Sequence, residues 1–203
     1  MKGFMTRDLG LMALNLRFFL VFIAIMGVVM TFSASSSVIG FLNLYVMIFA
    51  ASSLLGVFSY DEAGHWQSYA AAVPDGRRQQ VAGRYGATLT LWALITVIQT
   101  IMGLLAKEGV AGSLLYSGMF LLYVAFLLPL SYHFGTRSRL VMIVIIGVIA
   151  GLVAVAGTTL TLAGGPGGAG IPSFAALALL AIGAAALAIS YRISLKIMGK
   201  KEL

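Results

Sequence analysis

The sequence predicts an all-α integral membrane protein with six transmembrane helices, an N-terminal interfacial amphipathic helix and a short helix between spans two and three. Three observations predict this class: composition, apolar stretches and the placement of basic residues. Apolar residues make up 61% of the 203 residues and charged residues 9%, against about 25% charged in a soluble domain. Six apolar stretches follow, most near the roughly 20 residues that a helix needs to cross a bilayer.

Each stretch is expected to be helical, because a backbone in lipid must satisfy its own hydrogen bonds. The expected spans are Phe18–Phe32, Val38–Tyr60, Tyr85–Ala106, Gly109–Tyr132, Leu140–Ala163 and Ile171–Tyr191. The chain is therefore expected to form a single transmembrane domain over residues 1–203. Within it we expect the interfacial helix at 1–17, spans one and two at 18–60, a connecting loop at 61–83, and the remaining spans and tail at 84–203.

The net charge of +7 is interpreted as a signal of topology. Of the 13 Lys and Arg residues, all but Lys107 lie in segments that an even number of spans places on one side. Lys and Arg accumulate in cytoplasmic loops, so both termini are expected in the cytoplasm. The same residues are expected to contact anionic lipids of the bilayer, and no nucleic-acid partner is expected.

Residues 1–17 have the pattern of an amphipathic helix lying in the membrane interface. Apolar residues recur at three- and four-residue spacing, at Met1, Met5, Leu9, Met12 and Leu16. The charges of Arg7, Asp8 and Arg17 disfavour the alternative, a simple extension of span one.

The loop between spans two and three carries aromatic and acidic residues in a helical pattern. Ser59 and Glu62 have capping-box spacing, which predicts that a helix starts there. Trp66 and Tyr69 would share one face of this helix, and the turn residues 74–76 would end it. Two interpretations stay open: an aromatic belt at headgroup depth, or a docking surface for a cytoplasmic partner.

No set of residues has the arrangement of a catalytic, metal or cofactor site. The spans carry no ionisable residue at their centres, which argues against a proton-coupled transporter. His65 and His133 lack a nucleophile or carboxylate placed to work with them. The glycine-rich run 164–170 lacks the Lys of a phosphate-binding loop. An energy-consuming function would therefore need power from another subunit.

Polar and small residues within the spans suggest how the helices associate. Most hydroxyl and amide side chains are expected to make hydrogen bonds between helices, and Gln99 is also a candidate for lining a path. Gly147 and Gly151, followed by Ala154, would allow close approach of two helices. Span five is therefore the candidate seam of a homodimer.

The loops after spans two and four resemble the signatures of small six-span permeases of the type-2 class of ABC transporters. The first reads Phe58-Ser59-Tyr60-Asp61-Glu62, then Trp66, Tyr69, Val73-Pro74 and Arg77; the second reads Leu128-Pro129-Leu130-Ser131-Tyr132-His133-Phe134-Gly135, then Arg139. Two residues depart from the pattern. Gly76 stands where Ser or Thr is usual, and His133 stands where Lys is commoner.

The resemblance implies a permease homodimer served by two copies of a separate ABC ATPase, which would bind ATP and magnesium. This chain would hold no cofactor. A coupling helix over Asp61–Tyr69 would dock on the ATPase, with contacts from Asp61, Glu62, His65, Trp66, Tyr69, Pro74, Arg77 and Arg78. A second cytoplasmic contact would come from Tyr132, His133, Phe134 and Arg139. The resemblance also implies ATP-driven export across a bacterial cell membrane, with amphipathic peptides and bacteriocins among the substrates.

Two other functions stay open on the residues alone. One is a non-transporting membrane scaffold or immunity protein that binds a toxin directly. The other is a membrane-embedded lipid-modifying enzyme, whose polar groups would be limited to Asp61, Glu62, His65 and His133.

Overall fold

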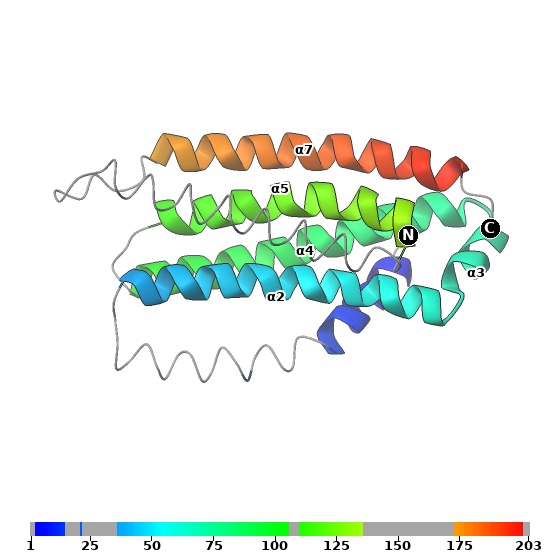
Figure 1. The fold of residues 1–203 in the computed structure, drawn as a ribbon, viewed down its shortest axis with the longest axis horizontal. Helices are drawn as coiled ribbons and strands as arrows, with labels where there is room; N and C mark the ends of the chain where they lie inside the picture. Colours follow the sequence, from blue (N-terminus) through cyan, green and yellow to red (C-terminus); the bar gives the residue numbers. More distant parts are fainter. Residues whose placement is uncertain (1–2, 15–20, 22–35, 106–109, 136–172, 201–203) are drawn as a thin grey trace.

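The computed structural model describes residues 3–14, 21, 36–105, 110–135 and 173–200, and every regular element in these ranges is helical. The named helices are α2 (Ser36–Ala63), α3 (Trp66–Ala72), α4 (Gly76–Leu105), α5 (Ala111–Phe134) and α7 (Ser173–Lys200). A further helix covers residues 3–14 and is called the N-terminal helix. The four long helices lie side by side in one elongated bundle (Figure 1).

The two ends of the bundle differ in what they carry. Helices α2, α5 and α7 run toward one end, and α4 runs back from it. The short helix α3 and the N-terminal helix both lie at this end (Figure 1), which we call the α3 end.

Four described helices are long and apolar enough to cross a membrane. They contain the segments Tyr45–Ala63, Gly76–Ile101, Ala111–Phe134 and Phe174–Lys200. These segments correspond to expected spans two, three, four and six. Expected span five lies outside the described residues, as do expected span one, apart from Val21, and the candidate dimer seam at Gly147, Gly151 and Ala154.

The prediction that a new helix starts at Ser59 is wrong. Helix α2 continues without a break to Ala63, and α3 begins at Trp66. The chain turns between them at His65, which adopts a left-handed conformation with φ 49°. The peptide N–H of Gly64 donates to the Tyr60 carbonyl at 3.0 Å and closes the last turn of α2. The helix boundary therefore follows the turn at 64–65, not the local capping-box spacing.

Helices α5 and α7 approach closely through two glycines. A Cβ at Gly118 would lie 2.9 Å from the Leu180 nitrogen, and one at Gly183 would lie 2.9 Å from the Gly118 carbonyl oxygen. Both clashes would involve backbone atoms, which cannot move aside as a flexible side chain can. Small residues allow this kind of contact between membrane helices.

Hydrogen bonds between helices account for only some of the polar residues in the spans. Trp92 and Thr96 of α4 bond to the Ser117 hydroxyl of α5 at 2.7 and 2.8 Å. By contrast, Ser53 and Thr88 donate to carbonyls of their own helices at 2.7 and 2.8 Å. Ser and Thr hydroxyls commonly bond back to the preceding turn in this way, so a polar residue in a span does not by itself mark a helix contact.

Replacing Gly118 with Leu should destabilise the bundle, because the new side chain would overlap the backbone of α7. We expect a loss of about 2 kcal/mol or more, the scale of overpacked cores. The measurement is thermal unfolding of the detergent-purified chain. Gly112→Leu is the matched control on the same helix, because a Cβ at Gly112 meets no atom within 4 Å. Equal unfolding temperatures for the two variants would contradict the close α5–α7 contact.

Candidate functional site

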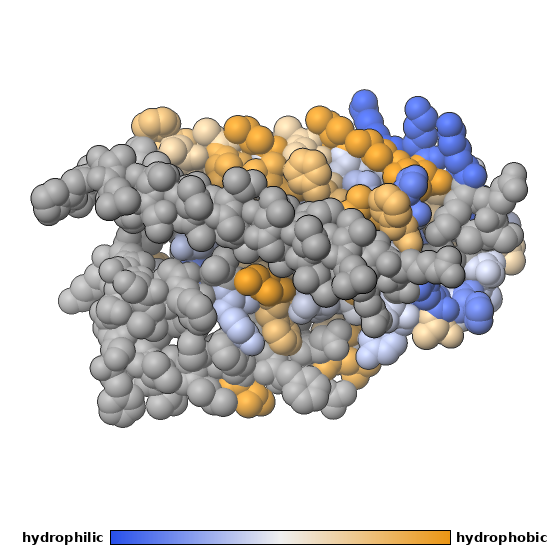
Figure 2. Space-filling model, viewed as in Figure 1, coloured by the Kyte–Doolittle hydropathy of each residue, from blue (hydrophilic) through white to orange (hydrophobic). Residues whose placement is uncertain are grey.

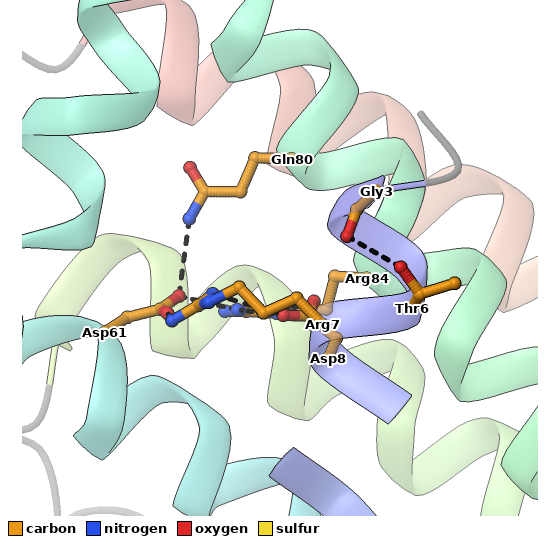
Figure 3. Close-up of polar contacts among 7 residues, drawn as sticks. All are labelled: Gly3, Thr6, Arg7, Asp8, Asp61, Gln80 and Arg84. Atoms are coloured by element: carbon orange, nitrogen blue, oxygen red, sulfur yellow. Dashed lines mark hydrogen bonds and ion pairs between the residues drawn. The ribbon is translucent and has the colours of Figure 1, made fainter. Parts of the chain in front are cut away.

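Four charged side chains meet inside the α3 end of the bundle. Arg7 and Asp8 come from the N-terminal helix, Asp61 from the last turn of α2, and Arg84 from α4 (Figure 3). We call these four residues the charge network.

Each arginine of the charge network bridges both aspartates. Arg84 reaches Asp61 Oδ2 at 2.5 Å and Asp8 Oδ2 at 3.1 Å. Arg7 reaches Asp61 Oδ1 at 2.7 Å and Asp8 Oδ1 at 3.4 Å. Gln80 Nε2 also donates to Asp61 Oδ2 at 3.3 Å. Positive and negative groups therefore alternate around a closed and neutral ring of contacts.

The charge network is almost fully removed from solvent. The side chains of Asp61 and Arg84 are 0% exposed, that of Asp8 is 3% exposed and that of Arg7 is 24% exposed. A buried charge is costly unless it is paired and hydrogen-bonded. The pairing therefore constrains the three helical segments that supply these residues to stay together.

Aromatic rings enclose the guanidinium group of Arg84. Its Cζ lies 4.2 Å from the centre of the Phe58 ring and 5.9 Å from that of Tyr132. The two rings meet edge to face at 5.2 Å. Cation–π attraction is stronger when the cation is desolvated. The end of α5, which carries Tyr132, is thus joined to the same site.

Glycines on α4 bring the N-terminal helix close enough to complete the charge network. A Cβ at Gly83 would lie 2.9 Å from the Phe4 Cβ, and one at Gly86 would lie 3.3 Å from the Met5 sulfur. The N-terminal helix therefore packs almost against the α4 backbone. This approach places Asp8 beside Arg84, the neighbour of Gly83 in sequence.

A stack of side chains connects the charge network to α3. The Cζ of Arg7 lies 3.9 Å from the centre of the Trp66 ring. Trp66 in turn contacts Tyr69 at 4.9 Å between ring centres and Phe4 at 6.1 Å. Helix α3 is therefore attached to the bundle through a ring that rests on a member of the charge network.

The structure brings the two signature loops together at the α3 end. Gly135 ends α5 with a φ of 63°, and Glu62 Oε1 lies within clashing distance of the position that a Cβ of Gly135 would take. Any other L-residue at 135 would be strained by this φ and would also collide with Glu62.

The predicted docking residues fall into three groups by position. Exposed residues are Glu62, His65, Tyr69, Pro74, Arg78, His133 and Phe134, and partly buried residues are Trp66 and Arg77. Asp61 and Tyr132 are buried. In this conformation their side chains pack inside the chain, so the other predicted residues supply the surface described here. Arg139 lies outside the described residues.

Gln99 lies buried between α4 and α2. Its Nε2 donates to the Asn43 carbonyl at 3.4 Å, and its side chain is fully enclosed. In this conformation the Gln99 side chain packs between these two helices.

Sequence reasoning did not find the charge network. Arg7, Asp8 and Arg84 were interpreted as interfacial or topological charges, and Gln80 was not singled out. One signal was present: Asp8 lies three residues after Met5 and four before Met12, on the apolar side of the N-terminal helix. An acidic residue on a buried face requires a basic partner, although the sequence does not say which one.

Replacing Arg84 with Met should strongly destabilise the protein, because Asp8 and Asp61 would lose their shared buried partner. Breaking a buried ion pair in this way costs about 3–5 kcal/mol. The measurement is unfolding of the purified chain, with Arg78→Met as the control on the exposed side of the same helix. Adding Asp8→Asn to Arg84→Met should restore part of the loss. No rescue, or equal effects at positions 84 and 78, would contradict the pairing.

The family comparison agrees with this membrane-spanning architecture. The model of the ABC-2 family transporter protein matches residues 3–199, nearly the entire chain. No curated protein matches the chain, and no solved structure matches it. Proteins of this family are transport components, and membership implies association with an ABC ATPase. The chain belongs to the ABC-2 family of membrane transporter proteins.

Proposed function

We propose that this chain is the permease subunit of an ATP-driven exporter that moves an amphipathic peptide or another hydrophobic substrate out of the cell. The active unit would be a homodimer with two copies of a separate ATPase. The α3 end would face the cytoplasm of a bacterial cell, with both chain termini on that side. The positive-inside rule supports this orientation. Apart from Arg84 of the charge network, the described Lys and Arg residues from Arg77 onward are exposed or partly exposed, and they lie at the α3 end.

The observation that carries the proposal is the continuous contact from α3 to the bundle. Trp66 rests on Arg7, and Arg7 bonds to Asp61 of α2 and, through the shared aspartates, to Arg84 of α4. A displacement of α3 by a partner would therefore act on a rigid, buried group that joins two spans. This arrangement suits a helix that converts movement of an ATPase into movement of the spans.

Helix α3 also has the surface that a docking element needs. Its Ala70 is buried against the bundle, whereas Tyr69 is 59% exposed. Aromatic side chains with accessible area are the usual energetic anchors of protein interfaces. We assign the docking surface to Glu62, His65, Trp66, Tyr69 and Pro74, with a second contact from His133 and Phe134.

The distribution of buried charge supports a hydrophobic or amphipathic substrate. Among the described residues, every buried charged side chain belongs to the charge network at the α3 end. The buried polar residues farther along the spans are neutral, as at Asn43, Gln99 and Ser117. An uncharged interior is better matched to an amphipathic chain than to an ion or a sugar, which would lose its hydration without replacement.

Trp66→Ala should weaken binding of the ATPase and uncouple its ATP hydrolysis from transport. Loss of an aromatic anchor costs about 2 kcal/mol, which is about a thirtyfold loss of affinity. Glu62→Lys should act in the same direction by reversing a charge on the docking surface. The measurements are affinity for the ATPase and substrate-dependent ATP hydrolysis in proteoliposomes.

Val110→Lys is the matched control for the added charge, since Val110 is exposed at the opposite end of the bundle. Trp66→Phe keeps a ring on Arg7 and should retain most of the coupling. Normal coupling in both Trp66→Ala and Glu62→Lys would refute the docking role.

The export function is tested in the native host by deleting this chain and measuring survival and release of amphipathic peptides. The proposal predicts greater sensitivity to such peptides, and restoration only when the chain is supplied with an ATPase able to hydrolyse ATP. Protection that persists with a hydrolysis-dead ATPase would instead favour a toxin-binding immunity protein. Unchanged peptide handling with altered sugar or ion flux would overturn the proposed substrate class.

A further inference from the structure

A groove of about 390 Å³ lies at the α3 end, away from the charge network. It is formed by the turn before α4, the first residues of α4 and the last turns of α7. Its lining consists of Val73, Asp75, Gly76, Arg77, Arg78, Leu195, Met198 and Gly199. The volume falls within the range of small-molecule sites, and the lining combines apolar residues with two arginines.

The two arginines of the groove have different surroundings. Arg77 donates to the carbonyl oxygen of Met198 at 3.5 Å, so it is held against the C-terminal end of α7. Arg78 is exposed, and among the described residues its side chain is given no hydrogen bond or ion pair. Asp75 is the one acidic residue of the lining. The groove therefore presents a net positive charge beside apolar walls.

Helix α7 continues this positive charge along a face that is otherwise apolar. Arg192, Lys196 and Lys200 recur every four residues and are exposed. The exposed Phe174, Ile182 and Ile189 lie on the same helical face, closer to the start of α7. Figure 2 shows the result along the upper edge of the molecule, where orange side chains give way to blue ones toward the α3 end.

This change from apolar to basic is the pattern of a helix that leaves the hydrocarbon at the level of lipid phosphates. Long basic side chains at such a boundary extend toward the headgroups. Gly199 of the groove wall lies next to Arg192 and Lys196 around the helix. An occupant of the groove that has an apolar part would therefore also contact the apolar face of α7. A water-soluble occupant would leave this face uncovered.

We propose that the groove binds the headgroup of an anionic phospholipid from the leaflet at the α3 end. Arg77 and Arg78 would bind the phosphate, the partly exposed Leu195 would contact the glycerol and upper acyl region, and the chains would lie along α7. The lipid would be a bound component of the protein and not its transported substrate. The inference does not depend on the proposed export function.

The test is native mass spectrometry of the full chain, purified in mild detergent with any ATPase that accompanies it. Phosphatidylglycerol and phosphatidylcholine with identical acyl chains are added in parallel, and inorganic phosphate is added as a competitor. We expect phosphatidylglycerol to be retained in preference to phosphatidylcholine, and phosphate at millimolar concentration not to displace it. Arg77→Gln with Arg78→Gln should lower phosphatidylglycerol affinity by about thirtyfold, since each basic residue contributes about a factor of five near an anionic surface.

A second variant separates shape from charge. A Cβ at Gly199 meets no atom within 4 Å, so Gly199→Phe should fill the groove without disturbing the helix. It should reduce phosphatidylglycerol binding while the net charge stays the same. Gly112→Phe is the matched control, because Gly112 is equally unobstructed and lies at the other end of the bundle.

Three results would overturn the proposal. Equal retention of the two lipids would show that the groove does not select an anionic headgroup. Displacement by inorganic phosphate would identify a soluble-anion site in place of a lipid site. The third result is that Gly199→Phe and the double arginine variant bind lipid as before but lose the accompanying ATPase. This result would assign the surface to the protein partner.

Discussion

The pairing of Arg84 is the constraint on which the rest of the α3 end depends. A guanidinium group stays charged at any physiological pH, so its complete burial is tolerable only if anionic groups and hydrogen bonds replace water around it. Asp61 supplies one of these groups from α2, and Asp8 supplies the other from the N-terminal helix. The positions of both helical segments relative to α4 are therefore linked through one side chain. Gly83 and Gly86 contribute to this pairing, because they let the N-terminal helix come close enough to α4 for Asp8 to reach Arg84.

A closed ring of two cations and two anions has a mechanical consequence. Moving any one segment by a few ångströms would leave a buried charge unpaired, so the segments are expected to move as a unit. Trp66 lies against the outermost and least buried member, Arg7, and thereby joins α3 to this unit. The contact of Glu62 with Gly135 adds the end of α5. Five helical segments therefore meet at this site: the N-terminal helix, α2, α3, α4 and α5.

The sequence predicts the features that depend on a local pattern of residues. It does not predict those that depend on contacts between charged residues far apart in the chain. Hydropathy predicted α2, α4, α5 and α7, because an apolar stretch of sufficient length has few alternatives in a membrane. It also indicated that the loop after span two is specialised. It could not show that Asp61 turns inward, because its partner Arg84 is 23 residues away and Asp8 reaches the same arginine from 76 residues away. The prediction of a helix start at Ser59 is wrong for a related reason: capping-box spacing is a local signal, and the chain turns later, at Gly64 and His65.

The basic residues at the α3 end have different roles, which the net charge of the chain does not distinguish. Arg84 and Arg7 are structural, since they neutralise buried aspartates. Arg77 satisfies a carbonyl at the end of α7, where the last turn of a helix leaves such groups unbonded. Arg192, Lys196 and Lys200 remain exposed in line with an apolar face. All of them would count equally toward the topology of the protein during insertion, yet Arg84 is fully buried afterward and no longer reaches a lipid headgroup. The basic residues thus share one role during insertion, which is to orient the chain. In the folded protein their roles differ: the buried ones stabilise the fold, and the exposed ones are available to contact lipid headgroups.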